Sequence, residues 1–276
     1  KSNTLLDVEA PILTLNNNSW GIKNGDFYFH TNSIKLDEVN VKIIDQKNEK
    51  VIAKKVEKAT EKFLINFNLG IDTIQIKQSR FIASQKFDFN NVNLTVLGLK
   101  NDYGKELHVN HVIFKNPKFT IYGQPRRVAQ REGKTSKEFN DVIKVDKISL
   151  VNGHLDVIPY QQKTPNLTLK QIQLAFNHIN VDPKTIQEAI PFSYKSVLLK
   201  SSGIDFDLGK TYKMNTGALQ FQNGNLTLNQ LKLTPKLSRK AYTASLDKQA
   251  DLYTVSVNQL QGNGIQWGIS PSKDFF

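Results

Sequence analysis

The sequence predicts a mostly β protein, with an elongated, repetitive, twisted antiparallel sheet that curls into a trough or sandwich and carries a few short helices. Two observations predict this class. Short alternations of apolar and polar residues, separated by Asn and Gly, fill most of the 276 residues. One eight-residue frame, clearest in Leu226–Leu233, also recurs from one end of the chain to the other, with apolar residues at positions one, three, six and eight.

The frame is a repeat with a polar pair at its centre. Apolar residues make up 39% of the chain, and at that content random order would give roughly one strict copy. The strict copies are Ile34–Val41, Leu69–Ile76, Phe87–Leu94, Ile143–Leu150, Leu167–Leu174 and Leu226–Leu233, with looser copies at Leu107–Phe114, Phe192–Leu199 and Val255–Gly262.

The spacing within the frame predicts a bend. Side chains of a strand alternate between faces, so the odd step from position three to position six would send the second apolar pair to the opposite face. A β-bulge or a tight corner at the polar pair, such as Asp37-Glu38 or Asn229-Gln230, would return all four side chains to one face. The alternative is a pair of short strands joined by turns in an ordinary sandwich.

Along the chain, we expect one elongated domain over residues 1–276. Residues 64–123 and 143–276 are similar in order as well as in pattern, which indicates an internal duplication, and the basic loop 124–140 separates them. A surface helix or an exposed strand pair is expected over Glu49–Phe63, a short helix from Ser136, and another over Asp182–Ile190.

Asparagine-rich points mark the expected turns. Asn16-Asn17-Asn18 reads as a turn between two strands. Asn152-Gly153 and Asn223-Gly224 each lie between apolar alternations, where Asn-Gly favours a tight hairpin.

The composition limits the function. Lys and Arg exceed Asp and Glu by a net charge of +12, spread along most of the chain, which is typical of a solvated outer face and makes anionic partners plausible. The absence of cysteine excludes disulfides and thiol chemistry. No apolar run reaches the roughly 18 residues of a membrane span, and the start at Lys1-Ser2 predicts an excised soluble piece from behind an anchor.

Residues for catalysis are hard to find. His108 and His111 would face opposite sides of a strand unless a bulge intervenes, and Asp205 and Asp207 are two acids without further ligands. No phosphate-binding glycine loop, nucleophile elbow or convincing acid pair is present. We therefore expect no enzyme, no metal, no cofactor and no nucleic-acid partner.

The repeats resemble those of the AsmA-like proteins of the bacterial cell envelope, which include TamB and share an architecture with bridge-like lipid-transfer proteins. The stretches that carry the resemblance are Ile143–Val157 with Leu167–Val181, and Leu226–Leu237 with Tyr242–Gly268. The resemblance implies a long sheet curled into a trough with an apolar interior. It also implies an inner-membrane anchor, a periplasmic location and a part in moving phospholipid.

Together, the frame and the resemblance predict a non-enzymatic lipid-binding or lipid-transfer module that holds acyl chains in an apolar β-groove. A one-sided apolar sheet must bury its face, and each acyl methylene buried contributes about 0.8 kcal/mol without a specific polar contact. The residues expected to line the groove are Ile34, Leu36, Val39, Val41, Ile71, Ile74, Ile76, Val92, Leu94, Ile148, Leu150, Ile172, Leu174, Leu231 and Leu233.

Two alternatives remain open. In the first, strands of the two halves close a dry core, and the protein is a structural or adhesive β-solenoid or sandwich that binds partners through its basic exterior. In the second, the chain is a carbohydrate-active β-helix enzyme, which would require an acidic cleft.

Overall fold

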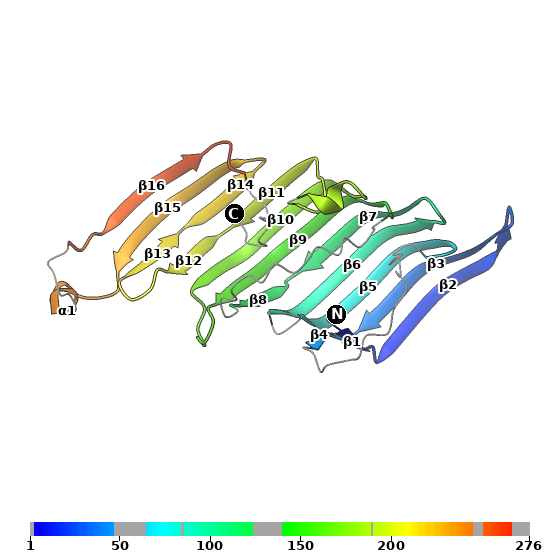
Figure 1. Ribbon diagram of the computed structural model, residues 1–276, viewed down its shortest axis with the longest axis horizontal. Coiled ribbons are helices and arrows are strands. Elements are labelled where there is room, and N and C mark those ends of the chain that lie inside the picture. Colours follow the sequence, from blue (N-terminus) through cyan, green and yellow to red (C-terminus); the bar gives the residue numbers. More distant parts are fainter. Residues whose placement is uncertain are drawn as a thin grey trace, which may run out of the picture.

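The computed structural model describes residues 3–46, 65–83, 86–123, 140–188, 190–244 and 251–266, and its sixteen strands form one sheet (Figure 1). This confirms the predicted mostly β class with few short helices. The strands are β1 (Asn3–Glu9), β2 (Ile12–Lys23), β3 (Asp26–Asp37), β4 (Asn40–Gln46), β5 (Asn68–Ala83), β6 (Phe87–Asp102), β7 (Glu106–Lys115), β8 (Lys118–Tyr122), β9 (Ile143–Ile158), β10 (Leu167–Val181), β11 (Ser196–Ser201), β12 (Gly203–Asp207), β13 (Tyr212–Thr216), β14 (Ala218–Gln222), β15 (Asn225–Pro235) and β16 (Val255–Gly262).

We call a rung either one long strand or two consecutive strands that lie end to end and together span the width of the sheet. Five rungs are of the second, interrupted kind. β3 and β4 both pair with β5, β7 and β8 both pair with β9, and β11 and β12 both pair with β10. In the same way, β1 pairs with β4 and β2 pairs with β3, while β13 and β14 both pair with β15. The sixteen strands therefore make eleven rungs, which lie side by side from β2 to β16 (Figure 1).

The sheet is mixed, whereas the sequence predicted an antiparallel one. The rungs of β3–β4 and β5 are parallel, and so are those of β7–β8 and β9. A parallel pair needs a connection of at least about a dozen residues, and the chain has such lengths between β4 and β5 and between β8 and β9. Both connections fall mainly on residues outside the described ranges, as do the expected helices over 49–63 and from Ser136 and all but the last residue of the basic loop 124–140.

The stretches that the sequence showed to be similar occupy equivalent places in the sheet. In each case an interrupted rung pairs in parallel with a long strand, which then forms a hairpin with the next long strand: β3–β4, β5, β6 in the first half and β7–β8, β9, β10 in the second. An imidazole–carboxylate pair repeats with them, because His30 lies 3.0 Å from Asp72 and His108 lies 3.0 Å from Asp146.

Bulges return the second apolar pair of the frame to the same face as the first pair, as the odd step from position three to position six predicted. Most rungs carry one residue with a left-handed backbone, and these residues form a row across the sheet: Glu38, Gln78, Asn91, Asn116, Asn152, Gln171 and Gln230, all with φ between 48° and 55°. In four of the six strict frames this is the second residue of the central polar pair. In the other two, the register skips Asp72 and Asp146, and the left-handed residue lies opposite, at Gly98 and His178.

Hydroxyl side chains add hydrogen bonds to the backbone where the rungs are interrupted. The Val39 N–H donates to Ser79 Oγ at 3.2 Å, and Ser79 Oγ donates to the Lys77 carbonyl at 3.0 Å. Ser201 Oγ likewise donates to the Lys170 carbonyl at 2.8 Å. Because an unsatisfied buried polar group costs about 1–3 kcal/mol, the Ser79 hydroxyl, which pairs with the Val39 N–H, stabilises the break between β3 and β4.

Three local expectations change. Asn16-Asn17-Asn18 is a bulge inside β2, with Asn17 at φ 54°, and Asn152-Gly153 is a bulge inside β9; neither is a turn. Asn223-Gly224 does form the expected hairpin, between β14 and β15. The helix expected over Asp182–Ile190 is a single 3-10 turn, η1 (Thr185–Gln187), and the Asp182 carboxylate accepts the N–H groups of Lys184 and Thr185.

Candidate functional site

One face of the sheet, which we call the inner face, is apolar across the rungs. Residues that pair directly across neighbouring strands point to the same face, so the register identifies its members. The longest row takes one apolar residue from each of ten consecutive rungs: Leu13, Leu36, Ile76, Leu94, Phe114, Leu150, Leu174, Leu199, Phe221 and Leu226.

The bulges bring the residues expected to line a groove to this inner face. The register aligns Ile34 with Ile74, Leu36 with Ile76 and Leu94, Val41 with Phe81, Val92 with Ser79, Ile148 with Phe176, Leu150 with Leu174, Ile172 with Gly153, and Leu231 and Leu233 with Val257 and Val255; Val39 and Ile71 lie on the same face.

Residues beyond the eighth position of the frame extend this face, and the sequence reasoning missed them. Phe81 and Phe119 follow their frames in this way and align with Phe89, which is the third position of the frame Phe87–Leu94; the rings of Phe89 and Phe119 meet edge to face at 5.0 Å. Leu155 continues the row on β9. The signal was present in the sequence, because apolar alternation resumes after each bulge, but a frame that ends at its fourth apolar residue does not count it.

Exposure along the inner face increases toward its ends. At the β2 end, Leu13, Trp20 and Ile22 are 58%, 72% and 77% exposed, and at the β16 end Val255 and Leu260 are 40% and 42% exposed. In the middle rungs Leu94 and Leu174 are half-buried, whereas Val92 and Ile172 are buried. All sixteen described strands lie in one sheet, so no second sheet of the described residues covers this face.

The opposite, outer face is polar and carries ion pairs between neighbouring rungs. Arg80 pairs with Asp88, Lys144 with Glu106, and Lys118 with Asp156. His108 and His111 share this face because the register skips Asn110, but they contact Asp146 and Ser149 separately. Within the described ranges no group of three or more metal-ligating side chains gathers.

The two carboxylates that could have held a cation are instead neutralised by lysines. Lys170 Nζ lies 2.6 Å from Asp205, and Lys236 Nζ lies 2.7 Å from Asp207. The hydrogen bond from Lys170 is the main reason that the pKa of Asp205 is lowered, and the bond from Lys236 acts in the same way on the pKa of Asp207. Both carboxylates are therefore structural groups of the outer face.

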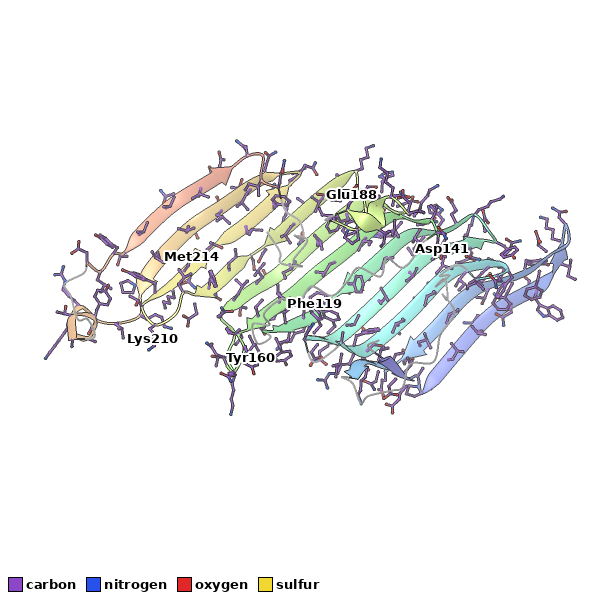
Figure 2. The ribbon with its side chains drawn as sticks, in the orientation of Figure 1. Phe119, Asp141, Tyr160, Glu188, Lys210 and Met214 are labelled. Atoms are coloured by element: carbon purple, nitrogen blue, oxygen red, sulfur yellow. The ribbon has the colours of Figure 1, made fainter. Side chains whose placement is uncertain are left out.

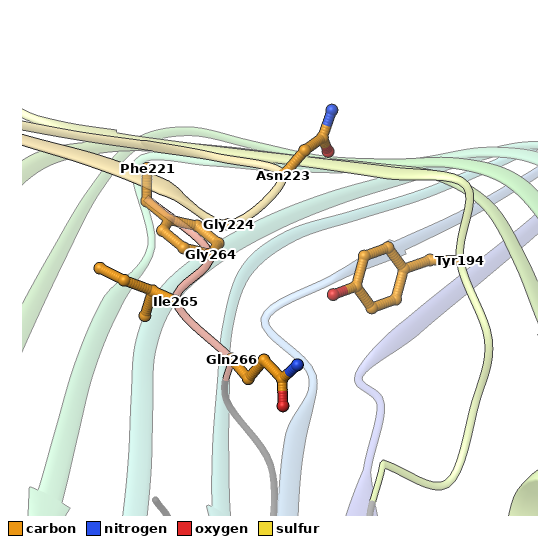
Figure 3. A pocket seen from close by; sticks show the side chains of 7 residues that line it. All are labelled: Tyr194, Phe221, Asn223, Gly224, Gly264, Ile265 and Gln266. Atoms are coloured by element: carbon orange, nitrogen blue, oxygen red, sulfur yellow. The ribbon is translucent and has the colours of Figure 1, made fainter. Parts of the chain in front are cut away.

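A hollow of about 410 Å³ lies where the inner face meets the edge of the sheet near the β14–β15 turn. Its lining includes Phe221 of the inner face, Tyr194, Ile265 and Gln266, and Figure 3 shows the strands arching over it. Tyr194 comes from the segment after η1, and its ring packs edge to face on Phe176 at 5.3 Å. The inner face is thus the concave side of the arch.

The fold and this face define a class: a single-layer β-trough with an apolar concave side and an ionic convex side. Comparison with protein-family models, with curated proteins and with solved structures finds no match for the chain. Across the part of the chain that the structure describes, no helix has the length and hydropathy to cross a membrane.

Proposed function

We propose that this protein is a non-enzymatic lipid-binding module that holds acyl chains against its inner face. The observation that carries the proposal is the row of ten apolar residues from Leu13 to Leu226, one per rung, which runs along the trough without a charged residue. Such a row offers apolar contact along its whole length, and burial of acyl methylenes at about 0.8 kcal/mol each needs no specific polar group.

The surroundings of the row support this proposal over a closed core. A closed core needs a second apolar layer, and the described strands all belong to one sheet. Trp20 and Ile22 at one end of the inner face are more than two-thirds exposed, and neighbouring exposed apolar side chains of this kind are typical of binding surfaces.

We also propose, from the resemblance to AsmA-like proteins, that the module works in the bacterial envelope on the periplasmic side. The full-length protein would be anchored in the inner membrane by a segment outside this sequence, and its cargo would be phospholipid. Fractionation of cells that express the full-length protein, followed by protease accessibility of the trough, tests this location.

Mass spectrometry of lipids extracted from protein purified without detergent tests the binding. We expect phospholipid in at least stoichiometric amount. The variant Leu94→Glu/Leu174→Glu places two carboxylates on half-buried positions of the inner face, and because burial of an unpaired charge is costly we expect it to lose at least about half of the bound lipid. Ile172 is a poorer position, since it is only 6% exposed and a carboxylate there would test stability first.

The matched control is Thr95→Glu/Gln173→Glu, which adds the same charge to the outer face of the same two strands. It should retain the lipid of the wild-type protein. Equal lipid in both folded variants, or a stable wild-type protein free of lipid, would refute the proposal and favour a closed-core protein that binds through its basic exterior.

A further inference from the structure

Three connections gather on one long side of the sheet, near its C-terminal end. They are residues 159–166 between β9 and β10, residues 208–211 between β12 and β13, and the described parts of the β15–β16 connection, 236–244 and 251–254, which include α1 (Arg239–Ala244). We call this surface the basic lip. In Figure 2, Tyr160 and Lys210 lie on this side, whereas Asp141 and Glu188 lie on the opposite long side.

Hydrogen bonds join the three connections into one surface. The Asp207 N–H donates to the Asn166 carbonyl at 2.6 Å, which ties the first connection to the second. Lys236 Nζ donates to Asp207 at 2.7 Å and to the Gly209 carbonyl at 2.9 Å, which ties the second to the third. The Tyr253 N–H completes the set by donating to the Tyr212 hydroxyl at 3.1 Å.

The basic lip presents free positive charge. Lys163, Lys210, Arg239 and Lys240 are exposed, and none of them forms an ion pair with another described residue. The opposite lip is different, because its charges nearly cancel: the acids Asp26, Asp102, Glu106, Asp141, Asp182 and Glu188 stand beside the lysines Lys23, Lys105, Lys144, Lys184 and Lys195. The net charge of the chain is therefore distributed unevenly between the two long sides of the trough.

Apolar and aromatic side chains accompany these charges. Tyr160, Leu208 and Tyr253 are 50%, 43% and 59% exposed. Tyrosine prefers the boundary between apolar and aqueous phases, and Lys and Arg beside it are attracted to anionic headgroups. The inner face reaches this lip directly, since Phe206 of β12 aligns with Met214 of β13 close to the connection 208–211 that joins the two strands.

We propose that the basic lip is the surface on which the trough docks to an anionic lipid bilayer. The inference rests on the proposed lipid-binding function and adds the place at which lipid enters. Tyr160, Leu208 and Tyr253 would enter the headgroup region, and the four free cations would hold the lip against anionic phosphate groups. The opposite lip, whose charges nearly cancel, would face away, so the apolar face would open toward the bilayer on one side only.

Vesicle sedimentation tests the docking, with phosphatidylcholine vesicles that contain or lack phosphatidylglycerol. We expect the wild-type protein to bind the anionic vesicles and to dissociate as salt is added. Each basic residue near an anionic surface contributes about 1 kcal/mol, or roughly fivefold, so Lys163→Gln/Lys210→Gln/Arg239→Gln/Lys240→Gln should weaken partitioning by at least about tenfold. The matched control removes four exposed lysines of the opposite lip: Lys23→Gln/Lys105→Gln/Lys184→Gln/Lys195→Gln.

The control should bind the anionic vesicles within about twofold of the wild-type protein, because the net charge changes equally in both variants and only the place differs. Equal loss in both variants would overturn the inference, since it would show attraction by net charge alone. So would failure to bind vesicles, or binding of a DNA duplex in place of vesicles.

The failure of this inference is distinguishable from the failure of the proposed function. The basic-lip variant should keep its co-purified lipid and lose vesicle binding, whereas Leu94→Glu/Leu174→Glu should lose lipid and keep vesicle binding. Lipid bound by a protein that does not recognise vesicles would overturn only the docking surface.

Discussion

Arg80 of β5 and Asp88 of β6 form a two-point ion pair across neighbouring strands on the outer face. Arg80 Nε lies 3.0 Å from Asp88 Oδ1, and Nη2 lies 2.6 Å from Oδ2. The side chain of Asp88 is only 11% exposed, while that of Arg80 is 47% exposed. The hydrogen bond to Asp88 raises the pKa of Arg80 above its usual value, against the opposing effect of desolvation.

Replacement of Arg80 should destabilise the fold. Arg80→Met leaves the Asp88 carboxylate without its partner at a mostly buried position, and a lost hydrogen bond to a charged group costs about 1.5–3 kcal/mol. Urea unfolding should show this decrease in the free energy of unfolding. Lys77→Met is the control, because it removes an exposed cation from the same strand. A decrease below about 0.5 kcal/mol would place Arg80–Asp88 among ordinary surface pairs.

The left-handed backbone at Gln171 gives a second prediction. Its φ is 48°, a conformation that strongly disfavours β-branched side chains. Gln171→Val should lower the free energy of unfolding by about 1–2 kcal/mol, and Gln171→Gly should be neutral or stabilising. Gln173→Val provides the comparison on the same strand and face, where φ is negative, and should have little effect. Equal effects of the two valines would contradict the bulge.

The third prediction concerns pH and His111. Burial lowers the pKa of His111, and the nearby charge of Lys147 lowers it further. A histidine whose pKa is depressed in the folded state binds more protons when unfolded, so its contribution is complete above the unfolded pKa of about 6.5 and is lost as pH falls through the folded pKa.

Urea unfolding of the wild-type protein and His111→Gln from pH 8 to pH 5, values set to bracket the unfolded pKa of about 6.5, measures this contribution. The wild-type protein should lose stability relative to the variant as pH falls below that value. A difference between the two proteins that stays constant with pH would contradict the depressed pKa.

The one-sided, bent strand could be predicted because the spacing of apolar residues within the frame determines which face of the strand each one occupies. An odd step between apolar pairs requires a bulge, and the structure has left-handed residues at Glu38, Asn91, Gln171 and Gln230, where the polar pairs fall. The same local reasoning brought all of the expected lining residues to one face.

The turns could not be separated from the bulges by sequence alone. Asn152-Gly153 and Asn223-Gly224 have the same two residues and the same left-handed asparagine, yet the first lies within β9 and the second reverses the chain. After Asn152-Gly153 the chain continues to pair with β10, whereas after Asn223-Gly224 it reverses and pairs with β14, the strand it has just left. The parallel pairings of β5 and β9 depend on long connections, and apolar periodicity does not report strand direction.

The row of left-handed residues also has a consequence for how such a trough can vary. Each rung corrects its own phase, and each meets only its two neighbours, so the correction does not depend on how many rungs precede it. A duplication or loss of whole rungs would leave every remaining side chain on its original side. The length of the apolar channel can therefore change by whole rungs while its cross-section stays the same.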